Sequence, residues 1–166
     1  MVADRRMRLM VAVASAALAV GMMGMAWPAS GGAAEPVDHR LLTSQKRLPA
    51  GMARELGRLA VTRPAYRQMW DHFRLRGERP GVNWSRKRVL FVTTGEPSIC
   101  PLRFRTLRLN DESKTFRLKA RSNRGECTDD WTPRTFVVAV ARDSIPKGKL
   151  SARVNWDRRV QVRRVR

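Results

Sequence analysis

The stretch TFRLKAR, residues 115–121, alternates strictly between apolar and polar side chains. Phe116, Leu118 and Ala120 fall on one side of an extended chain, and basic residues fall on the other. Similar runs rich in β-branched residues recur after Gly81, separated by Pro, Gly, Asn and Asp. We therefore expect five strands, in KRVLFVTT, PLRFRTLRL, KTFRLKARS, RTFVVAVAR and KLSARVNW. The apolar VLFV segment fits the centre of a sheet, and LNDESK fits a hairpin turn.

Upstream of these strands, apolar residues recur at intervals of three and four, which is the spacing of a helix with one buried face. The spacing extends from Met52 to Leu75 and is clearest in RPAYRQMWDHFRLRG, where Pro64 fits the first helical position after a cap at Thr62 or Arg63. The predicted fold class is α+β, with one amphipathic helix packed on a mostly antiparallel β-sheet. The predicted core anchors are the aromatic residues Trp70, Phe73, Phe91, Phe116 and Phe136.

The segments on either side of this central part have a different composition. Residues 35–50, EPVDHRLLTSQKRLPA, have proline near both ends and no sustained period, so we expect a linker with at most a short strand. Residues 156–166 are rich in arginine, and we expect a frayed tail, with a short strand through Val160 and Val162 as the alternative. The small α+β domain is thus predicted over residues 51–155.

Residues 1–34 have the layout of a secretory signal peptide. Arginines near the start form a basic region, an uncharged apolar run follows from Leu9 to Trp27, and small residues precede a cleavage site after Ala33 or Ala34. An uncleaved N-terminal anchor is the alternative. In both cases the positive-inside rule predicts that the rest of the chain is secreted or lies in the cell envelope.

The chain has two cysteines, Cys100 and Cys127, and the predicted compartment decides how they are interpreted. Oxidising surroundings favour disulfides, so we expect the two to pair and to stabilise the fold by roughly 3 to 4 kcal/mol. A reactive thiol would need a nearby base or a Cys-x-x-Cys spacing. A zinc site would need four ligands, which would take both cysteines and both histidines of the chain, His39 and His72. We therefore expect one disulfide, no metal and no cofactor.

The formal net charge of +20 concerns the partners of this chain more than its fold. Two interpretations stay open: an arginine bias spread along the chain, and a surface that faces a polyanion. Specific nucleic-acid binding is not expected, because the sequence has no recognition helix, zinc module or aromatic–basic RNA-binding signature. If the charge is functional, we expect the partner-binding surface to contain the basic strand residues Arg103, Arg105, Arg117, Lys119 and Arg121.

Catalysis is not expected from these residues. A serine nucleophile is typically held in a Gly-x-Ser-x-Gly elbow, and no serine lies in such a motif. The carboxylates Glu126, Asp129 and Asp130 cluster beside Cys127, where turn capping and pairing with arginines are the simpler roles. Their spacing is not that of a calcium loop. His72 lies on the predicted helix and fits an exposed helix residue better than a general base.

Six segments occur in a distinctive order: Tyr66-x-x-Met69-Trp70-x-x-Phe73, PGVNWSRKRVLFVTTGE, CPLRFRTLRL, FRLKAR, CTDDWTPRTFVVAV and DSIPKGKLSARV. This order resembles the PrcB C-terminal-domain-like family of exported bacterial proteins, and more closely its actinobacterial-type secreted relatives with a paired-cysteine motif. The resemblance covers about residues 63–155. It implies an α+β module and a role like that of an accessory subunit that stabilises an extracellular protease complex.

We therefore expect a secreted, non-enzymatic accessory module that acts through protein–protein contacts, at a sheet edge or at the loops near the disulfide. The alternative is a cell-envelope polyanion or membrane-surface binding protein that uses the same basic face. Salt separates the two, because polyanion binding weakens steeply with ionic strength, whereas a protein interface with an apolar centre persists. The identity of the partner and the oligomeric state stay open.

Overall fold

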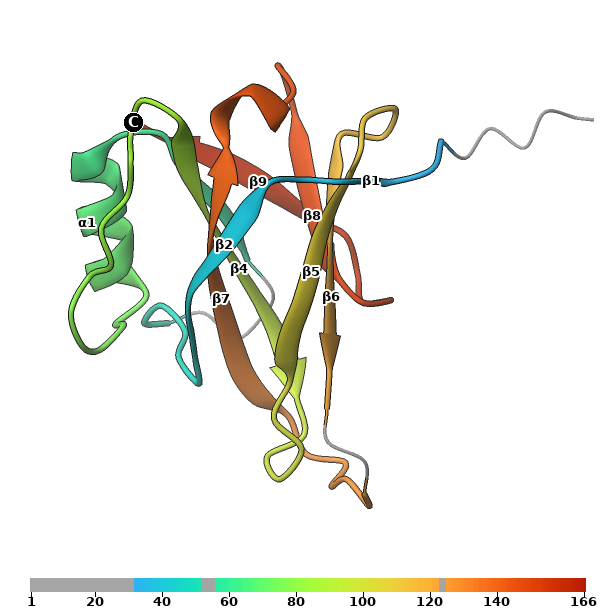
Figure 1. The fold of residues 1–166 in the computed structure, drawn as a ribbon. Coiled ribbons are helices and arrows are strands. Elements are labelled where there is room, and N and C mark those ends of the chain that lie inside the picture. Colours follow the sequence, from blue (N-terminus) through green and yellow to red (C-terminus); the bar gives the residue numbers. More distant parts are fainter. Residues whose placement is uncertain (1–31, 52–55, 123–124) are drawn as a thin grey trace, which may run out of the picture. The chain divides into compact units, whose positions relative to one another are not determined.

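The computed structural model describes residues 32–51, 56–122 and 125–166, which all lie in one compact unit, Gly31–Arg166. These residues form a nine-stranded sheet, one α-helix and a short 3₁₀ helix (Figure 1). The predicted signal peptide lies outside the described residues, apart from residues 32–34. Among the helices of the described part, none has the length and apolar character needed to cross a membrane.

The strands follow the spatial order β1-β5-β6-β8-β9-β3-β4-β7-β2. Their bounds are β1 Glu35–Pro36, β2 His39–Gln45, β3 Gly57–Ala60, β4 Lys87–Glu96, β5 Arg103–Asn110, β6 Thr115–Arg121, β7 Thr132–Ala141, β8 Leu150–Val154 and β9 Val160–Val165. The helices are α1 (Arg63–His72) and the 3₁₀ helix η1 (Arg142–Ser144). The five strands predicted after Gly81 are present as β4 to β8, and the predicted turn joins β5 to β6.

The sheet of the described residues is mixed: six of its eight strand pairings are antiparallel, as expected, and two are parallel. Strand β6 pairs with β8 in parallel, and β3 pairs with β9 in parallel, whereas the other neighbours are antiparallel. Both parallel pairings join segments that are distant in sequence. Alternation within a segment shows which residues share a face, but it carries no information about the direction of the neighbouring strand.

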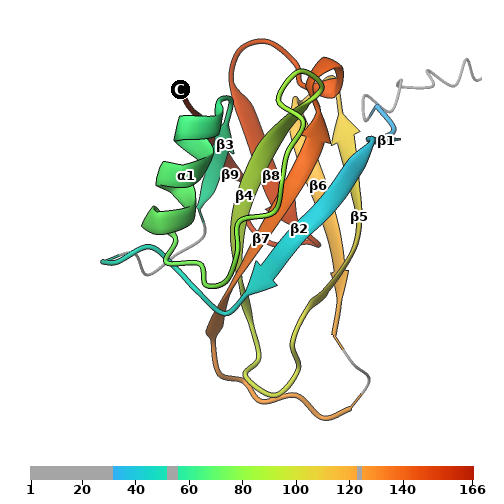
Figure 2. The ribbon, with the colours of Figure 1, turned by 60° about the vertical axis from the view of Figure 1, so that its left-hand side comes forward.

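The sheet curls until its two edges approach each other. Strands β1 and β2 lie at opposite ends of the strand order, yet only Val37 and Asp38 separate them in sequence. The chain from Pro36 to His39 can span at most about 11 Å, so the edges must come close. The His39 ring accordingly meets Phe104 of β5 edge-on, with ring centroids 5.4 Å apart. Figure 2 shows β2 and β5 along this seam.

Two apolar cores lie on the two faces of the curled sheet. The inner core fills the curl and includes Phe116 and Phe136. The outer core lies between α1 and the sheet and includes the other three predicted anchors, Trp70, Phe73 and Phe91. All five aromatic residues are buried, and Phe73 stacks on Phe91 with ring centroids 5.1 Å apart. The VLFV segment serves both cores, which explains why each of its residues is apolar.

The helix is capped at Thr62, one of the two expected cap sites, whose side chain accepts a hydrogen bond from the backbone N–H of Ala65. It begins at Arg63, so Pro64 is the second helical residue and not the first. The upstream part of the predicted helix is wrong over Gly57–Ala60, which forms β3, and residues 52–55 lie outside the described residues. Leu59 enters the inner core and Ala60 enters the outer core. A strand buried on both faces has consecutive apolar residues. Here Leu59 and Ala60 are such a pair, and they fitted the spacing of a helix.

Both flanking segments belong to the sheet, which corrects the predicted linker and the predicted tail. Strand β2 pairs antiparallel with β7 along the supposed linker. Strand β9 lies between β8 and β3, so the expected frayed tail is wrong and its alternative, a short strand through Val160 and Val162, is confirmed. Gly57 allows this approach, since an added Cβ would lie only 2.9 Å from a methyl group of Val162. Short segments with few apolar residues are thus ordered by strands from other parts of the chain.

Candidate functional site

The outer face of the sheet is covered by α1 on one half only. The helix packs on the β3, β4 and β7 region, whereas β5 and β6 lie away from it (Figures 1 and 2). On β6, the inner-core residues Phe116 and Leu118 alternate with Arg117, which therefore lies on the outer face. The register places Arg108 of β5 and Arg153 of β8 on either side of Arg117. Neighbouring strands are about 4.8 Å apart, so three arginines form a row about 10 Å long.

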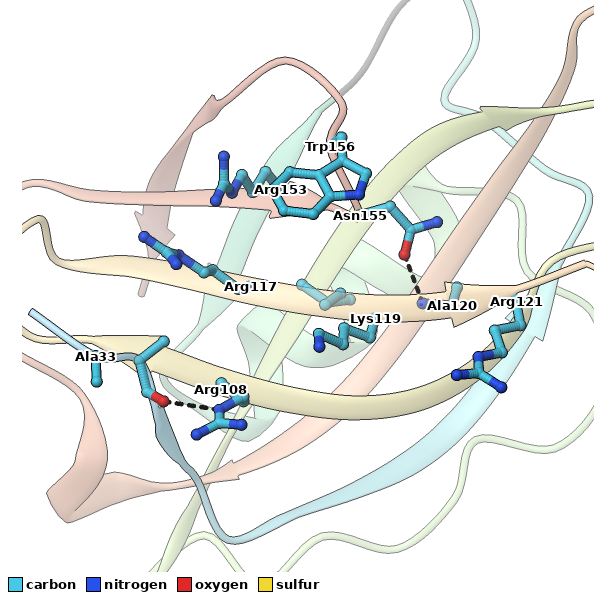
Figure 3. A pocket seen from close by; sticks show the side chains of 11 residues that line it. Ala33, Arg108, Arg117, Lys119, Ala120, Arg121, Arg153, Asn155 and Trp156 are labelled. Carbon is cyan, nitrogen blue, oxygen red and sulfur yellow. Dashed lines mark hydrogen bonds between the residues drawn. The ribbon is translucent and has the colours of Figure 1, made fainter. Parts of the chain in front are cut away.

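This row lies in a cavity of about 600 Å³, which we name the basic groove (Figure 3). Its lining residues are Ala33, Ala34, Arg108, Arg117, Leu118, Lys119, Ala120, Arg121, Arg153, Asn155 and Trp156. Five of them are cationic, and none of these eleven carries a carboxylate. No ion pair between described residues includes any of the five cations. The groove is thus a concentration of positive charge without internal neutralisation.

The three arginines of the row differ in how they are held. The Nε of Arg108 donates a hydrogen bond to the backbone oxygen of Ala34, at 2.7 Å. The Nε atoms of Arg117 and Arg153 are enclosed by protein, and neither has a hydrogen-bond partner among the described residues. An enclosed charged donor without an acceptor is costly, so the free protein holds these two arginines at an energetic cost.

Trp156 is the most exposed large apolar side chain of the described residues, with 89% of its surface accessible. The Arg153 guanidinium carbon lies 5.7 Å from the centre of its ring, within range of a cation–π contact. The preceding residue, Asn155, has a left-handed backbone with φ of 49°, which Asn tolerates better than most residues. The side-chain Oδ1 of Asn155 accepts a hydrogen bond from the Ala120 N–H at 2.8 Å. The backbone N–H of Asn155 donates one to the Leu118 carbonyl oxygen at 2.7 Å. The turn that carries Trp156 is therefore fixed to β6.

Of the five predicted partner-binding residues, three line the basic groove, namely Arg117, Lys119 and Arg121. Arg103 pairs with Arg121 across the strands, and Arg105 lies at a register shift in β5; both are exposed and neither lines the groove. The residues that the prediction omitted are Arg108, Arg153, Asn155 and Trp156. The alternation of β5 could have indicated Arg108. Arg153 and Trp156 depend on the parallel pairing of β6 with β8, for which the sequence has no local signal.

The predicted disulfide joins Cys100 to Cys127, with their Cα atoms 5.6 Å apart. Asp130 organises the adjacent loops, as it accepts a hydrogen bond from the Ser98 backbone N–H at 3.0 Å and another from the Thr128 hydroxyl. These bonds, the Thr128 hydroxyl first, lower the pKa of Asp130 to about 2. Asp130 thus has the capping role expected from the sequence.

Two exposed apolar side chains lie at the same end of the sheet as the disulfide. Ile99 is 61% accessible and Trp131 is 51% accessible. The Trp131 indole lies directly over Gly95, where any side chain would overlap it. This arrangement holds a flat aromatic surface beside the disulfide-linked loops.

Glu96 and His72 are two ionisable side chains outside the groove whose contacts the structure describes. Glu96 is the one buried carboxylate among the described residues. Its Oε2 accepts from Arg134 Nε at 2.8 Å and from the Leu102 N–H at 2.6 Å, and its Oε1 accepts from Arg134 Nη2 at 2.5 Å. His72 is exposed at the last turn of α1, with its ring edge-on to Phe73. In the described part of the chain, no three His, Cys, Asp or Glu side chains are placed to hold a metal ion.

No protein-family model, no curated protein and no solved structure matches this chain. The described residues form a curled, mixed nine-stranded sheet with one outer helix, one disulfide and a basic groove on the uncovered half. The resemblance to the PrcB C-terminal-domain-like family stays a prediction from the sequence motifs.

Proposed function

We propose that this chain is an exported, non-enzymatic module that binds an anionic polymer of the cell envelope through the basic groove. The observation that carries the proposal is the concentration of five cations without a carboxylate among the lining residues. Two unit charges about 5 Å apart repel each other by about 0.8 kcal/mol even at the dielectric constant of water, and by more in a groove. A bound polyanion would relieve this repulsion.

The test is binding of the purified, disulfide-bonded chain to the envelope fraction of the producing cell, at about 150 mM salt. A triple variant removes three charges from the groove: Arg117→Gln, Lys119→Gln and Arg121→Gln. A matched control removes three charges from exposed side chains on or after α1: Arg67→Gln, Arg76→Gln and Arg86→Gln. We expect the groove variant to lose retention and the control to keep most of it. Equal losses would show that net charge alone is responsible and would contradict the proposal.

A second candidate function is a protein contact at the disulfide-bearing end of the sheet, in the manner that the family resemblance implies. The observation that favours it is the exposed pair Ile99 and Trp131 beside the Cys100 loop. Exposed aromatic and aliphatic side chains are typical anchors of protein interfaces. If one stoichiometric protein is recovered from the envelope fraction, Ile99→Glu and Trp131→Glu should abolish its recovery, whereas the groove variant should not.

A further inference from the structure

The exposed indole of Trp156 restricts the class of ligand that fits the basic groove. A side chain of this size usually buries much of its surface, yet 89% of Trp156 is accessible. The Arg153 guanidinium lies over the ring, and the exposed fraction shows that most of the indole stays open to solvent (Figure 3). Because Asn155 ties the turn to β6, this open surface is held beside the arginine row before any ligand arrives.

The arginine row supplies the complementary half of a site. Arg117 and Arg153 lie opposite each other on β6 and β8, and both Nε donors lack partners among the described residues. The two Nη groups of a guanidinium form a planar fork that matches the two oxygens of a carboxylate, sulfate or phosphate. An oxyanion held by these forks would lie next to the indole, since the Arg153 guanidinium carbon lies 5.7 Å from the centre of the Trp156 ring.

On this basis, and resting on the proposed function, we infer that the ligand of the basic groove is an acidic polysaccharide. A sugar ring packs its C–H face on Trp156, while a carboxylate or sulfate of the same chain binds the forks of Arg117 and Arg153. Lys119 and Arg121 extend the cationic lining along β6 and accommodate further charges of the polymer.

Other polyanions fit the groove less well. Single-stranded nucleic acids bind through several aromatic platforms on which successive bases stack, and Trp156 is the one aromatic residue among the eleven that line the groove. Lipid surfaces favour several apolar side chains beside the cations, whereas the other apolar lining residues are Ala33, Ala34, Leu118 and Ala120, of which the last three are buried. Inorganic polyphosphate has the charges but no ring for the indole.

The experiment is calorimetric titration of the disulfide-bonded chain at about 150 mM salt with four probes. The probes are a sulfated dextran oligosaccharide, an oligogalacturonate, inorganic polyphosphate of matched charge and uncharged dextran. We expect at least one of the two acidic oligosaccharides to bind more tightly than polyphosphate, and uncharged dextran not to bind. The pair of oligosaccharides also distinguishes a sulfate from a carboxylate as the preferred group.

Variants of Trp156 separate stacking from charge. Trp156→Ala should weaken oligosaccharide binding about fivefold to tenfold, as expected for the loss of one aromatic packing contact, and should leave polyphosphate binding unchanged. Trp156→Phe should retain most of the affinity. Arg117→Gln should weaken binding of all the anionic probes, and Arg67→Gln serves as its control on the exposed face of α1. Because Trp156 is exposed, its substitution should not affect folding, which the thermal midpoint verifies.

The outcomes distinguish this inference from the proposed function. The polysaccharide inference is wrong if polyphosphate binds as tightly as both acidic oligosaccharides, or if Trp156→Ala changes the affinity for neither oligosaccharide. In either case general polyanion binding stands. If none of the anionic probes binds, or if Arg117→Gln and Arg67→Gln weaken binding equally, the proposed function itself is wrong.

Discussion

Arg117 and Arg153 lie directly opposite each other on the parallel strands β6 and β8, and the Nε atom of each is enclosed without a hydrogen-bond partner among the described residues. Like charges that face each other across two strands destabilise a sheet. No described carboxylate forms an ion pair with either arginine. The fold thus tolerates a local electrostatic cost at the place where we propose that the ligand binds, and such a cost is common at binding sites.

Removing one charge of this pair should stabilise the free protein. We expect Arg117→Gln to raise the free energy of unfolding by up to about 1 kcal/mol at low ionic strength, because the cross-strand repulsion disappears. Urea denaturation measures this change, and Arg67→Gln on α1 is the matched control that removes one exposed charge elsewhere. The gain should shrink when salt is added, since salt screens the repulsion. A loss of stability in Arg117→Gln would show that the arginine contributes more through packing than it costs through charge.

The buried pair of Glu96 and Arg134 should be the strongest polar determinant of stability. The Glu96 side chain is fully buried and is bound by both nitrogens of the Arg134 fork. Glu96→Ala leaves the guanidinium without its partner in a largely buried place, so we expect a loss of about 3 to 5 kcal/mol in the free energy of unfolding. Urea denaturation is again the measurement.

An exposed pair and a double variant serve as controls for the Glu96 prediction. Asp71→Ala, which removes the exposed partner of Arg79, should cost less than about 1 kcal/mol. The double variant of Glu96→Ala and Arg134→Ala should be more stable than the sum of the two single losses predicts, because no unpaired charge is left behind. Additive losses would mean that the two side chains do not act as a pair.

The disulfide should contribute a measurable share of the stability. It closes a loop with a sequence separation of 27, for which the chain-entropy estimate is about 3.5 kcal/mol. We expect the variant Cys100→Ser with Cys127→Ser to have a free energy of unfolding lower by this amount, and therefore to unfold at a lower urea concentration. A reducing agent should have the same effect on the natural chain. The double variant itself should be insensitive to the reducing agent. A natural chain whose unfolding midpoint ignores reduction would contradict this role of the bridge.

Tyr66 should titrate at unusually high pH. Burial raises its pKa to about 12, and its hydroxyl donates a hydrogen bond to Pro80 O at 3.3 Å. Since Tyr66 is the only tyrosine of the chain, absorbance at 295 nm reports its ionisation alone. We expect a midpoint near 12 in the folded protein and near 10 in concentrated denaturant.

The sign of the Tyr66 effect follows from this difference in pKa. Because the folded pKa is raised, the neutral phenol contributes stability that is fully present below about pH 10 and is lost as the pH rises through about 12. Tyr66→Phe should therefore lose less stability than the natural chain between pH 10 and 12. A midpoint near 10 in the folded protein would show that the hydroxyl is accessible to solvent.

Features that depend on neighbouring residues in the sequence were predictable. The alternation of residues 115–121 placed Phe116 and Leu118 in the core and Arg117 on the outer face, and the structure confirms this. The cap at Thr62 and the disulfide were also predicted. The first two rest on local rules, namely side-chain direction in a strand and hydrogen bonding at a helix start, whereas the disulfide was predicted from the expected oxidising compartment.

The sequence pattern misled where a segment derives its structure from distant strands. Residues 39–45 and 160–165 have little alternation of their own, yet they form β2 and β9 because β7, β8 and β3 supply their hydrogen bonds. Residues 57–60 matched a helical spacing because β3 is buried on both faces. Burial on two faces removes the alternation on which strand prediction depends.

The basic groove depends partly on neighbouring residues in the sequence and partly on strands that are distant in the sequence. The basic character of β6 is visible in the letters FRLKAR, because alternation is a property of one strand. The partnership of Arg117 with Arg153, and the position of Trp156 beside them, arise from the parallel register of β6 and β8. That register depends on how the whole sheet closes around its inner core, and packing between segments far apart in sequence leaves no periodic trace in either of them.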